Sequence, residues 1–219
     1  MLKAHFPADV FYNDATYDIQ YGNVRRATHR NTSWDVARFE VCAHKWMDVS
    51  EGNYGFSLMN DCKYGHSVDE KSVALTLLKS STEPNPTADQ EMHCFTYSIA
   101  PHSGDWRAAN TPEKAYKLNI PVTALPGQGG EADLASFARV DQPNVIVESV
   151  KRALKKDATI IRLYECFGQR AKVRLTLAEP PRSVKTVSLM EDELGDAAFS
   201  GNEIEFEVKP YEIVSFMVE

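Results

Sequence analysis

Most of the chain alternates apolar and polar residues with a period of two, which is typical of strands that bury one face. The clearest case is Glu203–Val208, in which Ile204, Phe206 and Val208 alternate with glutamates. Ser72–Leu78 is apolar almost throughout, which predicts a strand covered on both faces. Further extended segments are expected at 6–11, 15–21, 24–30, 54–59, 92–100, 120–125, 145–150, 159–166, 172–177, 184–189 and 213–218.

Residues 38–49 stand out, because their alternation predicts one long strand with two different faces. One face is apolar apart from Lys45. An ordinary solvent-exposed face would carry Thr, Ser and Lys. The opposite face instead carries reactive or recognition side chains, namely Arg38, Glu40, Cys42, His44, Trp46 and Asp48.

The spacing of these segments predicts an all-β fold of antiparallel sheets with little helix. Short strands separated by turn residues are typical of β-sandwiches, whereas βαβ units need a helix between strands. Only 104–119 looks helical or irregular. The run Pro-Gly-Gln-Gly-Gly at 126–130 breaks the pattern. We therefore expect a β-sandwich over 1–125, a connection over 126–140 and a smaller C-terminal β-sandwich over 141–219.

Composition and charge narrow the possible functions of the 219 residues. A hydrophobic content of 43% with 25% charged residues is ordinary for a globular protein with its own core. The net charge of -7 argues against non-specific binding of nucleic acid, which depends on neutralising phosphates. No apolar run approaches the roughly 20 residues of a membrane span, and no secretory leader is visible.

The cysteines Cys42, Cys62, Cys94 and Cys166 are widely spaced, and none forms a C-x-x-C pair. This favours free thiols in a reducing compartment, which we take as cytoplasmic, over disulfides. The two close pairs of His and Cys do not have the spacing of a structural zinc site. We therefore predict that these residues hold no metal.

The polar face of 38–49 has two interpretations. Arg38, Glu40, His44 and Asp48 could form a proton-transfer set, since a carboxylate beside an imidazole poises its pKa near neutrality. The favoured alternative is that Arg38–Glu40 and His44–Asp48 are charge pairs at a domain interface. The chain has no nucleophile elbow, phosphate-binding loop, dinucleotide fingerprint or zinc-protease motif.

Two further features suggest binding. Trp46, and less strongly Trp34, could stack on a sugar ring, although packing in the core is the commoner use of tryptophan. The stretch 60–65 offers amide, carboxylate, ammonium and phenol groups, as binding loops do. Its Asn, Asp and Gly are equally typical of an ordinary turn. The residues alone leave the function open.

A resemblance to a known family goes further. The run ATHRNTSWDVARFEVCAHKWMDVSEGNYGFSLMNDCKYG closely resembles the β-rich C-terminal part of the glycoside hydrolase family 38 α-mannosidases. The run RLYECFGQRAKVRLTL and the ending PYEIVSFMV are similar to the small terminal β-sandwich of the same proteins. The resemblance covers essentially the whole chain.

The family implies hydrolysis of α-mannosides with retention, through a carboxylate nucleophile, a second carboxylate as acid and base, and a zinc ion. Those groups belong to an N-terminal catalytic domain, which a helical domain follows, and no residue here matches them. The resemblance therefore implies a C-terminal region that has no catalytic residues and no cofactor and is inactive alone. Its expected partners are the catalytic and helical domains and the α-mannoside substrate, with a homo-oligomer left open and without nucleic acid or membrane.

By rough alignment with the family, the loop 60–65 reaches the substrate cleft. Asn60, Asp61, Lys63 and Tyr64 are then expected to contact mannose hydroxyls. The resemblance also implies that the polar face meets the other domains, through Arg38, Glu40, His44, Trp46 and Asp48. An independent carbohydrate-binding module is the alternative.

Overall fold

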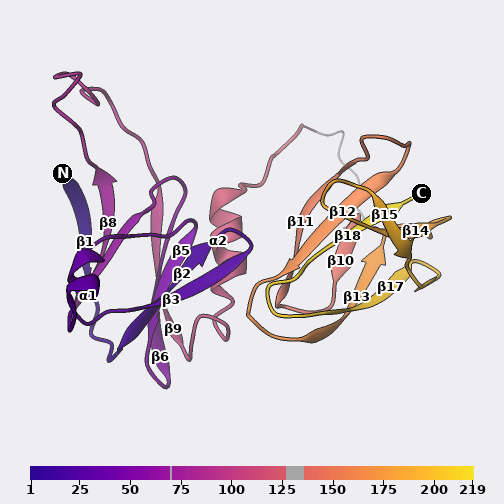
Figure 1. The fold of residues 1–219 in the computed structure, drawn as a ribbon, viewed down its shortest axis with the longest axis horizontal. Helices are drawn as coiled ribbons and strands as arrows, with labels where there is room; N and C mark the ends of the chain where they lie inside the picture. Colours follow the sequence, from indigo (N-terminus) through magenta and orange to yellow (C-terminus); the bar gives the residue numbers. More distant parts are fainter. Residues whose placement is uncertain (70, 127–135) are drawn as a thin grey trace. The chain divides into compact units, whose positions relative to one another are not determined.

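The computed structural model describes residues 1–69, 71–126 and 136–219, and within them the chain divides into two compact units, Met1–Ala124 and Leu125–Glu219 (Figure 1). Each unit contains two antiparallel sheets, so the predicted all-β class with little helix is confirmed. The predicted connection 126–140 extends over β10, a strand of the second unit, and 127–135 lie outside the described residues.

The first unit is a sandwich of a four-stranded sheet, β1-β8-β7-β4, and a five-stranded sheet, β3-β2-β5-β6-β9. Alternating apolar residues of both sheets meet between the layers, where Met47, Leu58 and Leu75 are completely buried. The elements of this unit are β1 (Leu2–Pro7), β2 (Asp14–Ile19), β3 (Gly22–Ala27), α1 (Ser33–Ala37), β4 (Val41–Cys42), β5 (Trp46–Ser50), β6 (Tyr54–Asn60), β7 (Gly65–Asp69), β8 (Ser72–Leu78), β9 (Tyr97–Ser103) and α2 (Thr111–Asn119).

Helix α2 covers the outer face of the five-stranded sheet, where it contacts β5 and β6 (Figure 1). Its first turn contains Pro112, which is favourable at that position because its missing N–H would have no partner inside the helix. Ala115 is completely buried against the sheet. The strands β5 and β6 are therefore covered on both faces, by the sandwich core on one side and by α2 on the other.

The predicted single strand over 38–49 is wrong. Thr32 and Asp35 form a capping box that starts α1 at Ser33, so the segment before 38 is helical. After α1 the chain enters the four-stranded sheet at β4 and then crosses to the five-stranded sheet at β5. Two strands in different sheets cannot share one alternation of faces, so the predicted grouping of polar side chains does not form.

Several other predicted segments differ from those in the structure. The strand expected at 92–100 begins at Tyr97 and continues to Ser103, and no strand occurs at 120–125. The segment 104–119, expected to be helical or irregular, contains α2 at its end. Ser72–Leu78 and Glu203–Val208 have the bounds that their hydrophobic patterns predict.

The second unit packs the sheet β10-β13-β17-β16 on the sheet β11-β12-β18-β14-β15. Ile161, Leu163, Leu175 and Ile204 are completely buried between these layers. Its strands are β10 (Ala138–Val140), β11 (Val145–Arg152), β12 (Thr159–Glu165), β13 (Ala171–Leu177), β14 (Val184–Val187), β15 (Glu193–Asp196), β16 (Phe199–Ser200), β17 (Glu203–Val208) and β18 (Ile213–Val218).

A buried carboxylate organises one end of the second unit. Glu165 is completely buried and accepts hydrogen bonds from the Asn144 amide and from the backbone N–H groups of Phe167, Gly168 and Tyr211. These donors precede β11, follow β12 and connect β17 to β18. One side chain therefore binds backbone N–H groups of two connections and the side-chain amide of a third.

His66 on β7 gives the first unit a pH-dependent stability. Burial lowers the pKa of its imidazole to about 4, and a ring nitrogen lies 3.2 Å from the carbonyl oxygen of Tyr64. An unfolded histidine protonates near pH 6.5. As the pH falls from 6.5 to 4, the unfolded state binds a proton that the folded state does not bind. The free energy of unfolding therefore falls by about 3 kcal/mol.

We expect His66→Gln to remove this loss. The free energy of unfolding of the wild type should fall about 3 kcal/mol more than that of the variant between pH 6.5 and 4. Urea titrations followed by tryptophan fluorescence measure this, since all three tryptophans lie in the first unit. His5→Gln, at an exposed position, should behave as wild type. Equal pH dependence in wild type and His66→Gln would contradict a buried neutral imidazole.

Candidate functional site

The loop after β6 is anchored by Asn60, which was predicted to bind substrate. Asn60 is 1% exposed; its amide N–H donates to the His44 carbonyl at 2.9 Å and its amide oxygen accepts from the Lys63 N–H at 2.6 Å. Its own carbonyl accepts from the Asn119 side chain at the end of α2. The side chain therefore holds the loop in place and has no surface for a ligand, which corrects the prediction.

Asp61 ties the same loop to the segment before β9. Its carboxylate accepts from the Thr96 N–H at 2.9 Å, and its own N–H donates to the Thr96 carbonyl at 3.1 Å. The Cys62 thiol, donating to this carboxylate, and the Thr96 N–H lower the pKa of Asp61. Burial, followed by the bond to Asp61, raises the pKa of the Cys62 thiol. Asp61 is thus an exposed, ionised group on a fixed backbone.

Lys63 and Tyr64 complete the loop. The Lys63 ammonium lies 5.1 Å from the centre of the Phe95 ring, a cation–π contact that limits its freedom. The Tyr64 ring lies 5.2 Å from the imidazole of His44 and is 55% exposed. Of the four predicted binding residues, Asp61, Lys63 and Tyr64 are at least partly exposed on the same loop, and only Asn60 is buried.

The residues predicted to lie on one polar face are dispersed. Glu40 forms an ion pair with Lys3 at 2.6 Å and accepts from the Thr76 hydroxyl, so the predicted Arg38–Glu40 pair is wrong. Gly65 passes so close to this carboxylate that a Cβ there would lie 2.8 Å from it. Arg38 is exposed just after α1, and His44 is half-buried beside Tyr64.

Trp46 and Asp48 point away from the solvent, into the layer under α2. Trp46 is 1% exposed and packs against Trp106, with ring centres 4.9 Å apart. Asp48 is 2% exposed and accepts from Ser57 at 2.6 Å and from His102 at 2.7 Å. Neither side chain has surface for a sugar or a partner domain, so these two predictions, and the predicted His44–Asp48 pair, are corrected.

The cluster of Asp48, Ser57, His102 and Thr111 contains the residue types of a catalytic triad. The hydroxyls of Ser57 and Thr111 lie 2.9 Å apart, and the bond to Asp48 raises the pKa of His102. Ser57 is completely buried, however, so no substrate reaches its hydroxyl. The cluster joins α2 and β9 to the central strands and has a structural role.

His102, Ser57, Thr111 and Trp106 were not found from the sequence. His102 is 54 positions from Asp48, and no local spacing indicates such a partner. The one available signal was a polar residue, Asp48, within an otherwise apolar strand, since a buried charge requires partners. That signal predicts that Asp48 has hydrogen-bond partners, but it does not identify which residues they are.

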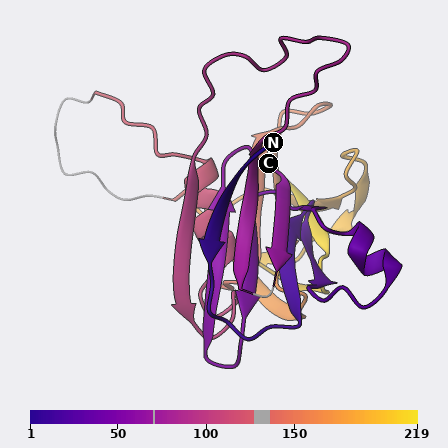
Figure 2. The ribbon, with the colours of Figure 1, turned by 90° about the vertical axis from the view of Figure 1, so that its left-hand side faces the viewer.

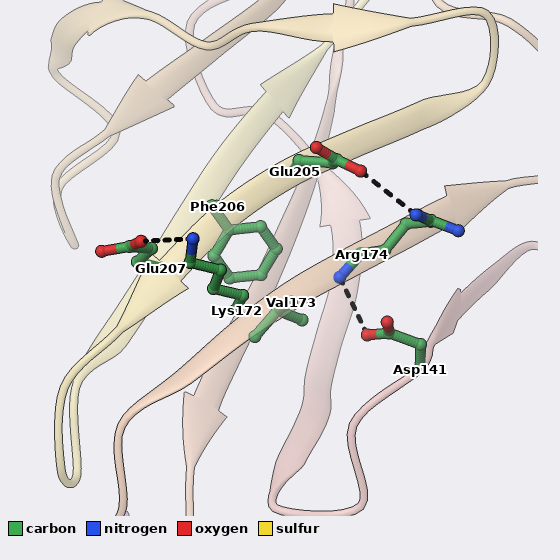
Figure 3. Close-up of a pocket in the computed structure, with 7 residues that line it drawn as sticks. All are labelled: Asp141, Lys172, Val173, Arg174, Glu205, Phe206 and Glu207. Atoms are coloured by element: carbon green, nitrogen blue, oxygen red, sulfur yellow. Dashed lines mark hydrogen bonds and ion pairs between the residues drawn. The ribbon is translucent and has the colours of Figure 1, made fainter.

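In the second unit, a hollow of about 400 Å³ lies over β13 and β17 (Figure 3). Its charged side chains are already engaged across the strands. The Lys172 ammonium lies 3.7 Å from the Glu207 carboxylate, and the Arg174 guanidinium lies 3.3 Å from the Glu205 carboxylate. The backbone N–H of Arg174 donates to the Asp141 carboxylate at 2.9 Å. This surface is a ladder of exposed ion pairs, each worth at most about 1 kcal/mol, and offers no cluster of free groups.

The described part of the chain holds no group of three or more His, Cys, Asp or Glu arranged to bind a metal ion. Cys42, Cys62, Cys94 and Cys166 are free thiols, and only Cys166 is buried. Neither helix within the described ranges has the length and apolar character that a membrane crossing requires.

Comparison with known families identifies both units. Residues 1–87 match the family model described as "Glycosyl hydrolases family 38 C-terminal domain", and residues 144–216 match "Glycosyl hydrolases family 38 C-terminal beta sandwich domain". The chain belongs to glycosyl hydrolase family 38. The two matches correspond to its C-terminal region, as the sequence motifs predicted.

Named relatives agree with this placement. The chain is 40% identical over 223 residues to alpha-mannosidase 2C1 of Homo sapiens and 38% identical to that of Mus musculus, with 99% of this chain covered. It spans only 21% and 22% of their lengths. The fold is similar to an alpha-mannosidase from Enterococcus faecalis V583, with a TM-score of 0.79 at 18% identity, over 99% of this chain and 25% of that one.

The buried network depends on space that a glycine provides. A Cβ at Gly55 would lie 2.2 Å from the imidazole Cε1 of His102 and 2.6 Å from the Ser50 hydroxyl, whereas Gly52 has nothing within 4 Å. We expect Gly55→Ala to lower the free energy of unfolding of the first unit by about 1–3 kcal/mol, the usual cost of overpacking.

Urea unfolding followed by tryptophan fluorescence measures the effect. The matched control Gly52→Ala, in the turn between β5 and β6, should change stability by less than about 0.5 kcal/mol. Equal stability of the two variants would show that His102 is not confined by Gly55.

Proposed function

We propose that this chain is the C-terminal β-region of an α-mannosidase, where it supports the catalytic domain and contributes the loop 61–64 to the mannoside-binding cleft. The observation that carries the proposal is that both units match the C-terminal domains of family 38. The 219 residues alone are inactive under this proposal, because the nucleophile, the acid/base carboxylate and the zinc site belong to the rest of the polypeptide. The four free thiols support a reducing, cytoplasmic setting.

The geometry of the loop supports its role at the cleft. Asp61 supplies an ionised acceptor, Lys63 a donor and Tyr64 an exposed aromatic ring and hydroxyl, which are the groups that bind sugar hydroxyls and ring faces. The Lys63 N–H donates to the Asn60 amide oxygen and the Asp61 N–H donates to the Thr96 carbonyl, and these bonds fix the loop backbone. A preorganised loop loses less conformational entropy when it binds a ligand.

A second candidate, an independent carbohydrate-binding module, is favoured by one observation. Trp34 is 76% exposed, whereas Trp46, the tryptophan first considered as a platform, is buried. Titration of the 219-residue chain with manno-oligosaccharide separates the candidates. A Kd at or below about 1 mM, near -4 kcal/mol, supports the module. Undetectable binding, together with no cleavage of an aryl α-mannoside when zinc is present, supports the supporting role.

The role of the loop is tested in the full-length enzyme with Lys63→Ala. Loss of a charge-assisted hydrogen bond to the substrate should lower kcat/KM for a mannoside by about ten- to a hundredfold. Lys114→Ala, on the exposed side of α2, is the matched control and should leave kcat/KM unchanged. A Lys63→Ala enzyme with the kcat/KM and thermal stability of wild type would refute the loop's role.

A further inference from the structure

A corner of the first unit exposes apolar residues in an ordered segment. Helix α1 buries none of its five residues, and the reciprocal bonds between Thr32 and Asp35 define its first turn. In Figure 2 it projects from the strands as a dark violet coil. Its exposed apolar side chains are Trp34 at 76%, Val36 at 54% and Phe39, just beyond it, at 61%.

The same corner carries more cations than carboxylates, because Asp35 is the one acidic residue among the described residues that line its pocket. Arg26, Arg30 and Arg38 line one pocket with His66, and none of the three arginines has an ion pair within 4.0 Å among the described residues. The neighbouring Arg25, by contrast, pairs with Asp14 at 2.7 Å. We call Arg26, Arg30, Trp34, Val36, Arg38 and Phe39 the α1 corner.

The pocket also contains buried polar atoms that make no hydrogen bond among the described residues. The Nε of Arg26 and the Nε2 of His66 have no hydrogen-bond partner within the described residues. A larger hollow of about 750 Å³ adjoins the pocket and shares Thr28, His29 and Arg30 with it. Phe11, which is 81% exposed, lines this hollow. The open space and the aromatic surface of Phe11 therefore belong to the larger hollow, which Arg30 also lines.

This combination fits a protein partner better than other ligands. Trp and Arg are the residues most enriched among those that dominate the binding energy of protein interfaces. The chain's net charge of -7 disfavours nucleic acid. A symmetric contact with a second copy places the same patch on both sides, so arginines would face arginines. Charge complementarity therefore requires an acidic partner.

We propose that the α1 corner binds an acidic segment in the remaining part of the α-mannosidase polypeptide. Carboxylates of that segment pair with Arg30 and Arg38, and its apolar side chains pack on Trp34 and Phe39. The relatives provide the material for such a segment, because this chain spans only 21% of the human protein. The inference rests on the proposed function, since it takes its partner from the same enzyme.

Site-specific crosslinking in the full-length polypeptide tests the contact directly. With p-benzoylphenylalanine in place of Trp34, irradiation should join position 34 to a peptide outside these 219 residues that contains Asp or Glu. The same photoreactive residue at Lys172, an exposed position of the second unit, serves as the control for non-specific capture. Crosslinks only within the 219 residues, only to a second copy, or equally from both positions would overturn the proposal.

Charge reversal supplies an independent test. Arg30→Glu combined with Arg38→Glu should lower the crosslink yield from position 34 by about tenfold or more, because carboxylates would then face carboxylates. The matched variant Arg25→Glu should keep the wild-type yield. Since α1 buries no residue, circular dichroism should show both variants folded. An unchanged yield in the double variant would refute the acidic partner.

The outcomes separate this inference from the proposed function. Hydrolysis of an aryl α-mannoside by the same full-length polypeptide reports on the function, whatever the crosslinks show. An active enzyme without crosslinks from the α1 corner leaves the function standing and removes the inference. A polypeptide that crosslinks as expected but has no mannosidase activity removes the function and retains the interface.

Discussion

The carboxylate of Asp48 lies inside the first unit, where it accepts hydrogen bonds from Ser57 and His102 at 2.6 and 2.7 Å. A buried charge is costly unless it is paired, so these bonds are required for β5 to be covered on both faces. They connect the central strand to β6 and β9, and Ser57 continues the network to Thr111 at the start of α2. The helix is thereby held over the sheet at a polar point within an apolar layer.

Hydrogen bonds at the end of α2 also hold the loop after β6. Asn119 donates to the Asn60 carbonyl, and the Asn60 side chain in turn fixes the backbone of Lys63 and of His44. The surface groups proposed to meet substrate therefore lie on a backbone held from the interior. The contrast with α1 is informative, because α1 is ordered by its own capping box and exposes its apolar side chains.

These two surfaces are consistent with the proposal that the chain is part of a larger enzyme. Family 38 membership and the relatives' greater length agree with that view. One surface, the loop proposed to meet substrate, is polar and is held by hydrogen bonds to the interior. The other combines aromatic residues with arginines that form no ion pair within 4.0 Å among the described residues, which suits a contact between parts of a protein. The second unit shows a different chemistry, with paired charges along β13 and β17 and a buried Glu165 that binds backbone N–H groups.

The sequence by itself determined the all-β class and strands such as Ser72–Leu78 and Glu203–Val208, because burial on one or two faces leaves a direct record in hydrophobic periodicity. Its motifs also identified the family. Only the tertiary structure decided that 38–49 divides between two sheets, that Trp46 is buried while Trp34 is exposed, and that Asp48 pairs with His102. Alternation shows which side chains share a face of a strand. Which layer covers that face depends on residues far away in the chain, such as α2, and local spacing carries no record of them.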